Sequence, residues 1–202
     1  MKSFFQVGLF GSLLLTTACM GQKRETPKID LSEKKILMII ASNNFRDEEY
    51  QKPRRIFEEA GAKITVASSA LNTAKGMLGL AVKPDTLVTA VNAADFDAVI
   101  FVGGPGSTEY WNHPKAHQLA KDAFAAGKVI GAICLAPVTL ANAGILKGKK
   151  ATVFNTAAGQ LKAKGVQYTG AAVEIADKIV TADGPASAEK FGHTVAKLLV
   201  EK

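Results

Sequence analysis

The sequence has few of the residues that build metal centres or disulfide frameworks. Its 202 residues include only two cysteines and three histidines. No CxxC, HExxH or EF-hand spacing occurs, which excludes the common zinc and calcium motifs. We therefore expect no metal site and no cofactor, so that any chemistry would come from ordinary side chains.

The chain also lacks a concentration of charge along its sequence. Its net charge is +7, and the lysines are scattered apart from a short cluster at Lys147, Lys149 and Lys150. Proteins that bind nucleic acid usually gather positive charge on one face. We interpret the cluster as a solvated surface and expect no nucleic-acid partner.

No apolar run is long enough to cross a bilayer, which takes roughly 20 residues. The one candidate, from Phe4 to Leu15, is shorter and follows Lys2. A charged start, a short apolar core and small residues before a cleavage point are typical of a secretory signal. We predict that residues 1–18 are a signal peptide that is absent from the mature protein.

The end of this segment, LTTAC at residues 15–19, resembles a bacterial lipobox, with its leucine one position further from the cysteine than usual. The resemblance implies cleavage before Cys19 and a diacylglyceryl thioether on its sulfur. Several acyl chains make such an anchor stable. Residues 19–33 would then be the lipidated cysteine and a flexible tether. This places the protein in the cell envelope, at the outer membrane facing the periplasm in a cell with two membranes. The alternative is a soluble secreted protein cleaved nearby.

The remainder, residues 34–202, predicts one α/β domain, because apolar residues make up 48% of the chain and suffice for a single core. Unbroken apolar runs are typical of buried parallel strands, and glycines follow the expected helices. Strands are predicted at residues 35–41, 63–68, 97–102, 129–133, 151–154, 173–176 and 179–182. Helices are predicted at residues 48–60, 114–126, 136–143 and 187–200, with a small excursion at 77–91. This alternation predicts a doubly wound, mostly parallel sheet with helices on both faces.

The most informative segment is VIGAICLAP at residues 129–137, where a buried strand leads through Cys134 into a helix. The small residues Ala132 and Ala136 flank the cysteine on either side. This layout is typical of a nucleophile elbow, in which a sharp turn exposes one reactive side chain. A helix N-terminus behind the sulfur would favour the thiolate, so we expect an accessible thiol of low pKa. The alternative is an inert cysteine buried in the core.

Two further loops follow predicted strands and so belong to the same sheet edge. The first contains Gly103, Gly104, Pro105 and Gly106, where glycines let backbone N–H groups approach a ligand, although such a run can also be a plain turn. The N–H groups of Gly104 and Leu135 are candidates for an oxyanion hole above the cysteine. The second loop is FRDEE at residues 45–49. Its acidic residues open a helix, where the helix dipole alone would favour them.

These motifs together resemble the ThiJ/PfpI (DJ-one-like) superfamily. The resemblance rests on FRDEE followed by Pro53, GGPG, AICLAP, GILKGKKAT and TADGPAS, and it covers residues 34–202. It implies a flavodoxin-like fold of the class I glutamine amidotransferase type, and frequent homodimers. In that family the acidic residue four positions before the proline hydrogen-bonds the nucleophilic cysteine. The resemblance therefore selects Glu49, rather than Asp47 or Glu48, as the partner of Cys134.

The sequence departs from the family where histidines are concerned. Protease-like members carry histidine directly after the cysteine, and this chain has Leu135. The DJ-one branch places a histidine on the strand after the elbow helix, where this chain has Phe154. His113 follows the glycine loop and is a candidate accessory residue, whereas His193 is expected on a helix face. Without a cysteine–histidine dyad a peptidase lacks its general base.

Three classes of function fit these residues. The first is a small-molecule enzyme, similar to glyoxalases, amidases or hydratases, in which Cys134 attacks an electrophile and Glu49 moves a proton. The second is a redox-responsive protective protein in which Cys134 is oxidised. If Cys19 is acylated, Cys134 has no disulfide partner within the chain. The third is a binding module that keeps the fold without turnover.

Overall fold

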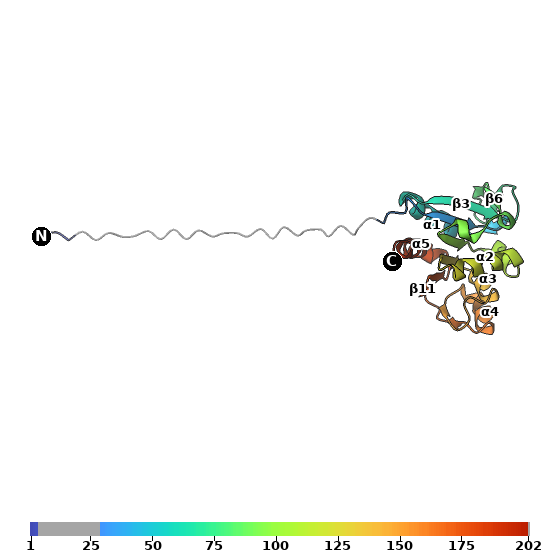
Figure 1. Cartoon of the computed structure of the whole chain (residues 1–202). Coiled ribbons are helices and arrows are strands. Elements are labelled where there is room, and N and C mark those ends of the chain that lie inside the picture. The colour runs from blue at the N-terminus through green and yellow to red at the C-terminus, as the bar shows by residue number, and fades with distance from the viewer. Residues whose placement is uncertain (4–28, 202) are drawn as a thin grey trace.

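A computed structural model describes residues 1–3 and 29–201 (Figure 1). Most of the predicted signal peptide, the candidate lipidation site Cys19 and most of the tether lie outside these residues, so those expectations stay predictions. Among the residues described, no helix is long and apolar enough to cross a membrane.

The domain is built on a seven-stranded sheet in the order β11-β12-β8-β7-β1-β3-β6. All neighbours are parallel except β11 and β12, which form an antiparallel pair at one edge. The strands are β1 (Lys35–Ile39), β3 (Lys63–Ser68), β6 (Thr86–Leu87), β7 (Ala98–Phe101), β8 (Val129–Ile133), β11 (Val173–Ala176) and β12 (Ile179–Ala182). The mostly parallel, doubly wound α/β fold predicted from the sequence is therefore confirmed.

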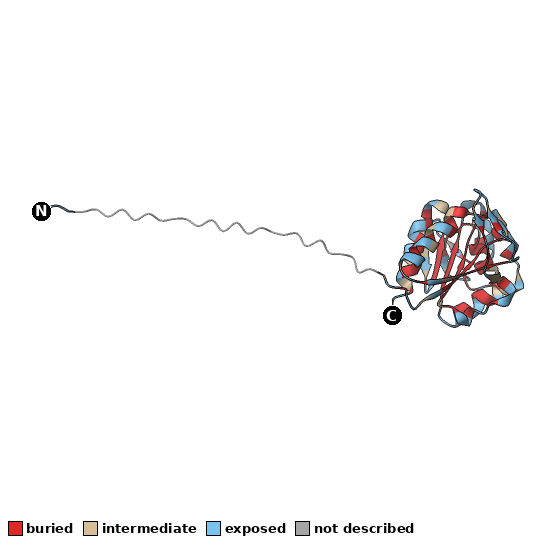
Figure 2. Cartoon of the chain, turned by 90° about the horizontal axis from the view of Figure 1, so that it is seen from above, coloured by how far each residue is buried: buried red, intermediate tan, exposed pale blue. Residues whose placement is uncertain are grey.

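The central strands are apolar because helices cover the sheet on both faces. Four of the five residues of β1, and every residue of β7 and β8, are buried. The helices are α1 (Asp47–Glu59), α2 (Pro114–Ala125), α3 (Pro137–Asn142), α4 (Ala158–Ala163) and α5 (Ala188–Leu198). Helices α1 and α5 pack against each other, as do α2 and α3. Figure 2 shows the buried strands at the centre, with the exposed helix surfaces turned outward.

Two small additions surround the main sheet. Strands β2 (Asn43–Phe45), β4 (Ala74–Gly76) and β5 (Ala81–Val82) form a three-stranded sheet, whose β4–β5 hairpin corresponds to the excursion expected at residues 77–91. Strands β9 (Lys150–Ala151) and β10 (Gln167–Tyr168) form a two-stranded sheet. Short 3-10 turns complete the chain at Val88–Ala90, Ala93–Asp95, Pro105–Tyr110, Asn155–Ala157 and Pro185–Ser187.

One predicted strand, residues 151–154, is wrong over most of its length. Only Ala151 belongs to a strand, the two-residue β9. The N–H of Thr152 donates to the hydroxyl of Thr181, and the N–H of Phe154 donates to the carbonyl of Cys134. The chain therefore leaves the ladder to run beneath the elbow. Apolar residues alone could not reveal this, because they are buried in either arrangement.

Candidate active site

The cysteine turn adopts a backbone conformation that few side chains tolerate. Cys134 follows β8 directly and has a φ of 61°, in the left-handed region. Its N–H donates to the carbonyl of Ala182 at 2.9 Å, and its carbonyl accepts from the N–H of Phe154 at 2.9 Å. Strain of this kind costs on the order of 1–3 kcal/mol and persists only where neighbours hold it. The turn is the nucleophile elbow that the sequence predicted.

Glu49 lies beside the cysteine and is completely buried in the first turn of α1. Gly103 separates the two side chains and shows how closely they approach. A Cβ at Gly103 would lie 2.4 Å from Oε2 of Glu49 and 2.6 Å from Cβ of Cys134. Glycine is therefore the residue that this position accepts. The structure thus brings together two residues that are far apart in the sequence.

The Glu49 carboxyl group has an unusual set of neighbours. Neither of its oxygens makes a hydrogen bond of regular geometry to the described residues. The thiol of Cys134 and the N–H of Gly103 are nevertheless close enough to favour its ionised form. A buried carboxyl group without a firm partner is costly unless it is protonated or used in chemistry.

The other two acidic residues of this loop have different tasks. Asp47 is buried, and its two oxygens accept hydrogen bonds from the N–H groups of Leu78 and Leu80 at 2.9 and 2.8 Å. It therefore fixes the turn of the β4–β5 hairpin. Glu48 points outward and pairs with Arg46 at 2.7 Å. Of the three carboxylates, only Glu49 faces the cysteine.

Burial controls the ionisation of the pair. It raises the pKa of Glu49 to about 8, although the Cys134 contact and the positive charge of Arg46 act in the opposite direction. Burial, followed by the charge of Glu49, raises the pKa of Cys134 to about 12, while the N–H groups of Gly104 and Leu135 favour its thiolate. Like charges in a dry site disfavour each other. The two groups therefore do not ionise together near neutral pH.

The expectation of an accessible thiol of low pKa is wrong in this structure. Cys134 is only 7% exposed, and its pKa is raised rather than lowered. Helix α3 begins at Pro137, three residues after the cysteine, and is only six residues long. Its dipole acts within about one turn, so it does little to offset desolvation and the nearby carboxylate.

The two predicted oxyanion donors meet at the sulfur. The N–H groups of Gly104 and Leu135 both act as hydrogen-bond donors to the ionised Cys134. Gly104 has a φ of 95°, and a Cβ there would lie 2.4 Å from the backbone nitrogen of Arg46. The glycine loop and the FRDEE loop are therefore in contact, and the site is held by backbone from three strand ends.

Two residues contribute to the site in ways that the sequence did not indicate. Arg46 caps the start of α1, and its charge acts on both Cys134 and Glu49. The indole N–H of Trp111 donates to the carbonyl of Leu135 at 2.9 Å and so supports the elbow from outside. Neither role follows a periodic pattern, because each depends on how the loops fold together.

The histidines do not supply a base to the cysteine among the described residues. Nδ1 of His113 accepts from the N–H of Ala116 at 3.3 Å and caps α2. Nε2 of His117 lies 2.8 Å from the carbonyl of Trp111. His193 is exposed on α5, as expected. The residues described also include no group of three or more His, Cys, Asp or Glu side chains able to hold a metal ion.

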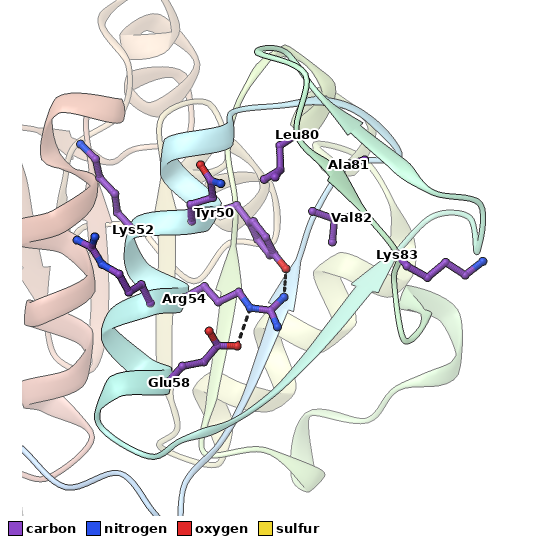
Figure 3. Close-up of a pocket in the computed structure, with 10 residues that line it drawn as sticks. Tyr50, Lys52, Arg54, Glu58, Leu80, Ala81, Val82 and Lys83 are labelled. Atoms are coloured by element: carbon purple, nitrogen blue, oxygen red, sulfur yellow. Dashed lines mark hydrogen bonds and ion pairs between the residues drawn. The ribbon is translucent and has the colours of Figure 1, made fainter.

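A larger pocket lies away from the cysteine, on the outer side of α1. It has a volume of about 660 Å³ and is bordered by α1 and β5 (Figure 3). Tyr50, Arg54 and Glu58 form one wall, where Arg54 bonds to both other residues. Neither Cys134 nor Glu49 lines this pocket. Its size therefore gives no support to its being the reactive site.

The fold and the site define an α/β protein with a cysteine nucleophile elbow and a buried glutamate partner. Residues 34–198 match the model of the DJ-1/PfpI family, and the chain belongs to that family. It is 40% identical over 196 residues to an uncharacterized protein of Methanocaldococcus jannaschii, which covers 96% of this chain and 93% of that protein. It is 29% identical over 163 residues to a deglycase of Pyrococcus horikoshii, which covers 81% of this chain and 98% of the deglycase.

Solved structures agree with this assignment. A ThiJ/PfpI domain protein from Brachyspira murdochii superposes with a TM-score of 0.80 at 34% identity, over 84% of this chain and 97% of that one. DJ-1beta of Drosophila melanogaster gives a TM-score of 0.76 at 29% identity, over 84% and 91% of the two chains. The family and fold expected from the motifs are therefore confirmed.

Proposed function

We propose that the protein is a cysteine-dependent enzyme acting on small carbonyl compounds, with Cys134 as nucleophile and Glu49 as acid and base. The observation that carries the proposal is the buried Glu49 carboxyl group, which has no regular hydrogen-bond partner and lies beside the sulfur. Relatives named as a deglycase and as a glutathione-independent glyoxalase of Caenorhabditis elegans support a small-molecule substrate.

The first step follows from these groups. Sγ of Cys134 forms a bond to the carbonyl carbon while the π electrons move to the oxygen. The thiol proton passes to ionised Glu49, which returns it to the new oxyanion, so that no oxidant or reductant is needed. The N–H groups of Gly104 and Leu135, which lie at the sulfur, can stabilise the charge that develops there. For a 2-oxoaldehyde the product of this step is a hemithioacetal.

The ionisation of Glu49 gives this step a pH dependence. Only ionised Glu49 can take the thiol proton, and its pKa is raised to about 8. We therefore expect turnover to rise from neutral pH toward about pH 8. The glyoxalase-, amidase- and hydratase-like alternatives share this first step and differ in the leaving group.

A substrate screen tests the proposal. The purified domain would be assayed against dicarbonyls, amides and peptides, next to Cys134→Ser and Glu49→Gln. We expect turnover of a dicarbonyl or amide that both variants lose, and no peptide cleavage. Activity that survives in Cys134→Ser would contradict the assignment of the nucleophile. An inert protein would favour the binding-module alternative.

The redox-responsive function predicted as an alternative is less favoured by the site. Oxidation of a cysteine follows its thiolate character and its exposure. Cys134 is buried and its pKa is raised, so its reaction with oxidants should be slow. Peroxide treatment followed by mass spectrometry would restore this alternative if Cys134 became sulfinic acid faster than a free thiol does.

The setting of the enzyme is part of the proposal. We infer that Cys19 carries the lipid anchor, which would hold the domain at the cell envelope, and that the domain forms a homodimer. Mass spectrometry of protein from its native membrane would find a lipidated N-terminal Cys19. An unmodified N-terminus beginning at Met1 would contradict export. Light scattering of the purified domain would decide its oligomeric state.

A further inference from the structure

The sheet edge opposite Cys134 gathers lysines that are dispersed along the sequence. Lys35 and Lys63 are the first residues of β1 and β3 and are paired in register. Lys128 and Lys178 immediately precede β8 and β12, and Lys34 precedes β1. Because these strands are parallel and aligned, their starting residues lie along one edge.

Three of these lysines line a common pocket. Lys34, Lys128 and Lys178 border a cavity of about 230 Å³, together with Asp97 and Glu201. Every ion pair found among residues 29–201 uses other cations, so none of the three ammonium groups is neutralised by a salt bridge there. The pocket therefore presents unpaired positive charge to an incoming group.

The two carboxylates of the pocket are already engaged. Asp97 accepts a hydrogen bond from the N–H of Lys35 at 2.9 Å. Glu201 pairs with Lys197 at 3.6 Å. Further carboxylates near this edge are Glu33, Asp95 and Asp177, the last of which pairs with Lys149. The positive charge is thus local to the pocket and its neighbouring lysines rather than spread over a whole face.

The same edge receives the N-terminal segment of the domain. The N–H of Leu31 donates to the carbonyl of Ala60 at 2.7 Å, and the chain then enters β1 at Lys35. Figure 1 shows the N-terminal segment joining the domain at the end where the C-terminus lies. A tether from a lipidated Cys19 would therefore arrive beside the lysines.

We propose that this lysine edge docks on an anionic lipid surface, with lipid phosphate groups bound by Lys34, Lys128 and Lys178. The location of the surface rests on the proposed lipid anchor, whereas the pocket and its charge do not. A lysine near an anionic bilayer raises affinity by roughly fivefold. Docking by this edge leaves Cys134, at the carboxyl ends of the strands, directed away from the membrane and open to soluble substrates.

Vesicle binding by the domain without its anchor tests the proposal. Residues 29–202 can be studied alone, because the Pyrococcus horikoshii deglycase is covered to 98% and the Brachyspira murdochii structure to 97% by this domain. Co-sedimentation would compare phosphatidylcholine vesicles with vesicles containing about 30% phosphatidylglycerol. We expect binding to the anionic vesicles at low salt, and little binding to the neutral ones.

Matched charge variants locate the surface. Replacing the three pocket lysines by glutamine should weaken binding to anionic vesicles by about 100-fold. The control removes the same charge from other exposed or half-exposed sites, by Lys75→Gln, Lys115→Gln and Lys190→Gln, and should bind nearly as the natural chain does. Lys178→Gln alone, at an exposed position, should cost about fivefold and gives a milder variant if the triple variant does not fold.

Several results would overturn the proposal. Equal losses in the two triple variants would show a general charge effect. Equal binding to neutral and anionic vesicles would exclude phosphate recognition. Competition by inorganic phosphate without any vesicle binding would show a site for free anions only. Absence of lipid on Cys19 would contradict the anchor but would leave the vesicle result unchanged, so the two proposals can fail separately.

Discussion

The two edges of the sheet hold their polar groups in opposite ways. At the carboxyl edge, Glu49 and Cys134 are buried, and backbone groups from three loops surround them. At the amino edge, lysines line an open pocket and form no ion pairs among the described residues. Burial lets a few groups shift their pKa values and act on one atom. Exposure lets many charges act together on a broad surface.

The largest effect should come from the nucleophile. Cys134→Ser replaces sulfur by a much weaker nucleophile of similar shape, so turnover should fall by about 1,000-fold or more. Thermal unfolding should change little, because the hydroxyl group fits the same space. Kinetics on the substrate found by screening would measure the loss. A loss of less than about tenfold would remove Cys134 from the mechanism.

The next effect concerns the position between the two reactive groups. In Gly103→Ala the new Cβ would meet the carbonyl of Ile133 and Oε2 of Glu49, each at 2.4 Å. The shift should cost about 100-fold in turnover, because small displacements at a reacting centre are expensive. The matched control is Gly159→Ala, where the Cβ meets nothing within 4 Å. Similar kinetics for both variants would show that the close contact has no role.

A smaller effect should appear in stability. The pKa of Glu49 is raised from 4.5 to about 8 on folding. Its favourable contribution is therefore complete below about pH 4.5 and is lost as the pH rises through about 8, where the buried carboxyl group ionises. Glu49→Gln avoids that ionisation. Calorimetry should show the variant gaining roughly 5 °C or more relative to the natural chain between about pH 5 and pH 8.5. A constant difference would contradict the raised pKa.

The smallest effect should distinguish the two edges by salt. Raising the ionic strength to about 0.5 M screens exposed charges far more than buried ones. Vesicle binding by the lysine edge should disappear, whereas turnover at the cysteine edge should change by less than about twofold. Vesicle binding that persists at high salt would indicate apolar insertion instead. A turnover as sensitive as vesicle binding would mean that the buried pair responds to surface charge.

The sequence predicted the frame of the molecule well because burial leaves a strong pattern. Residues 63–68, 129–133, 173–176 and 179–182 were predicted as strands with the bounds that the structure gives them. The antiparallel pairing of β11 with β12 was not predicted, because both strands carry the same alternation in either direction. Helix α4 was missed because it is only six residues long.

The candidate site was predictable in its members more than in its electrostatics. Cys134 was selected by its place at a strand end, and Glu49 by the family motif. The raised pKa of the thiol was not anticipated, because the sequence shows a helix following the cysteine but not how deeply the sulfur is buried. The contacts made by Arg46 and Trp111 were also invisible, since they join loops that are distant in sequence.

The central claim is that Glu49 holds a proton at Cys134 near neutral pH. The most direct test is a pH titration of carbon-13-labelled glutamate side chains by NMR, with Glu49→Gln to assign the signal. The account predicts one carboxyl resonance with a midpoint near 8, which disappears in the variant. Every glutamate titrating near the ordinary value of about 4.3 would contradict it. A shifted resonance that persists in Glu49→Gln would contradict it as well.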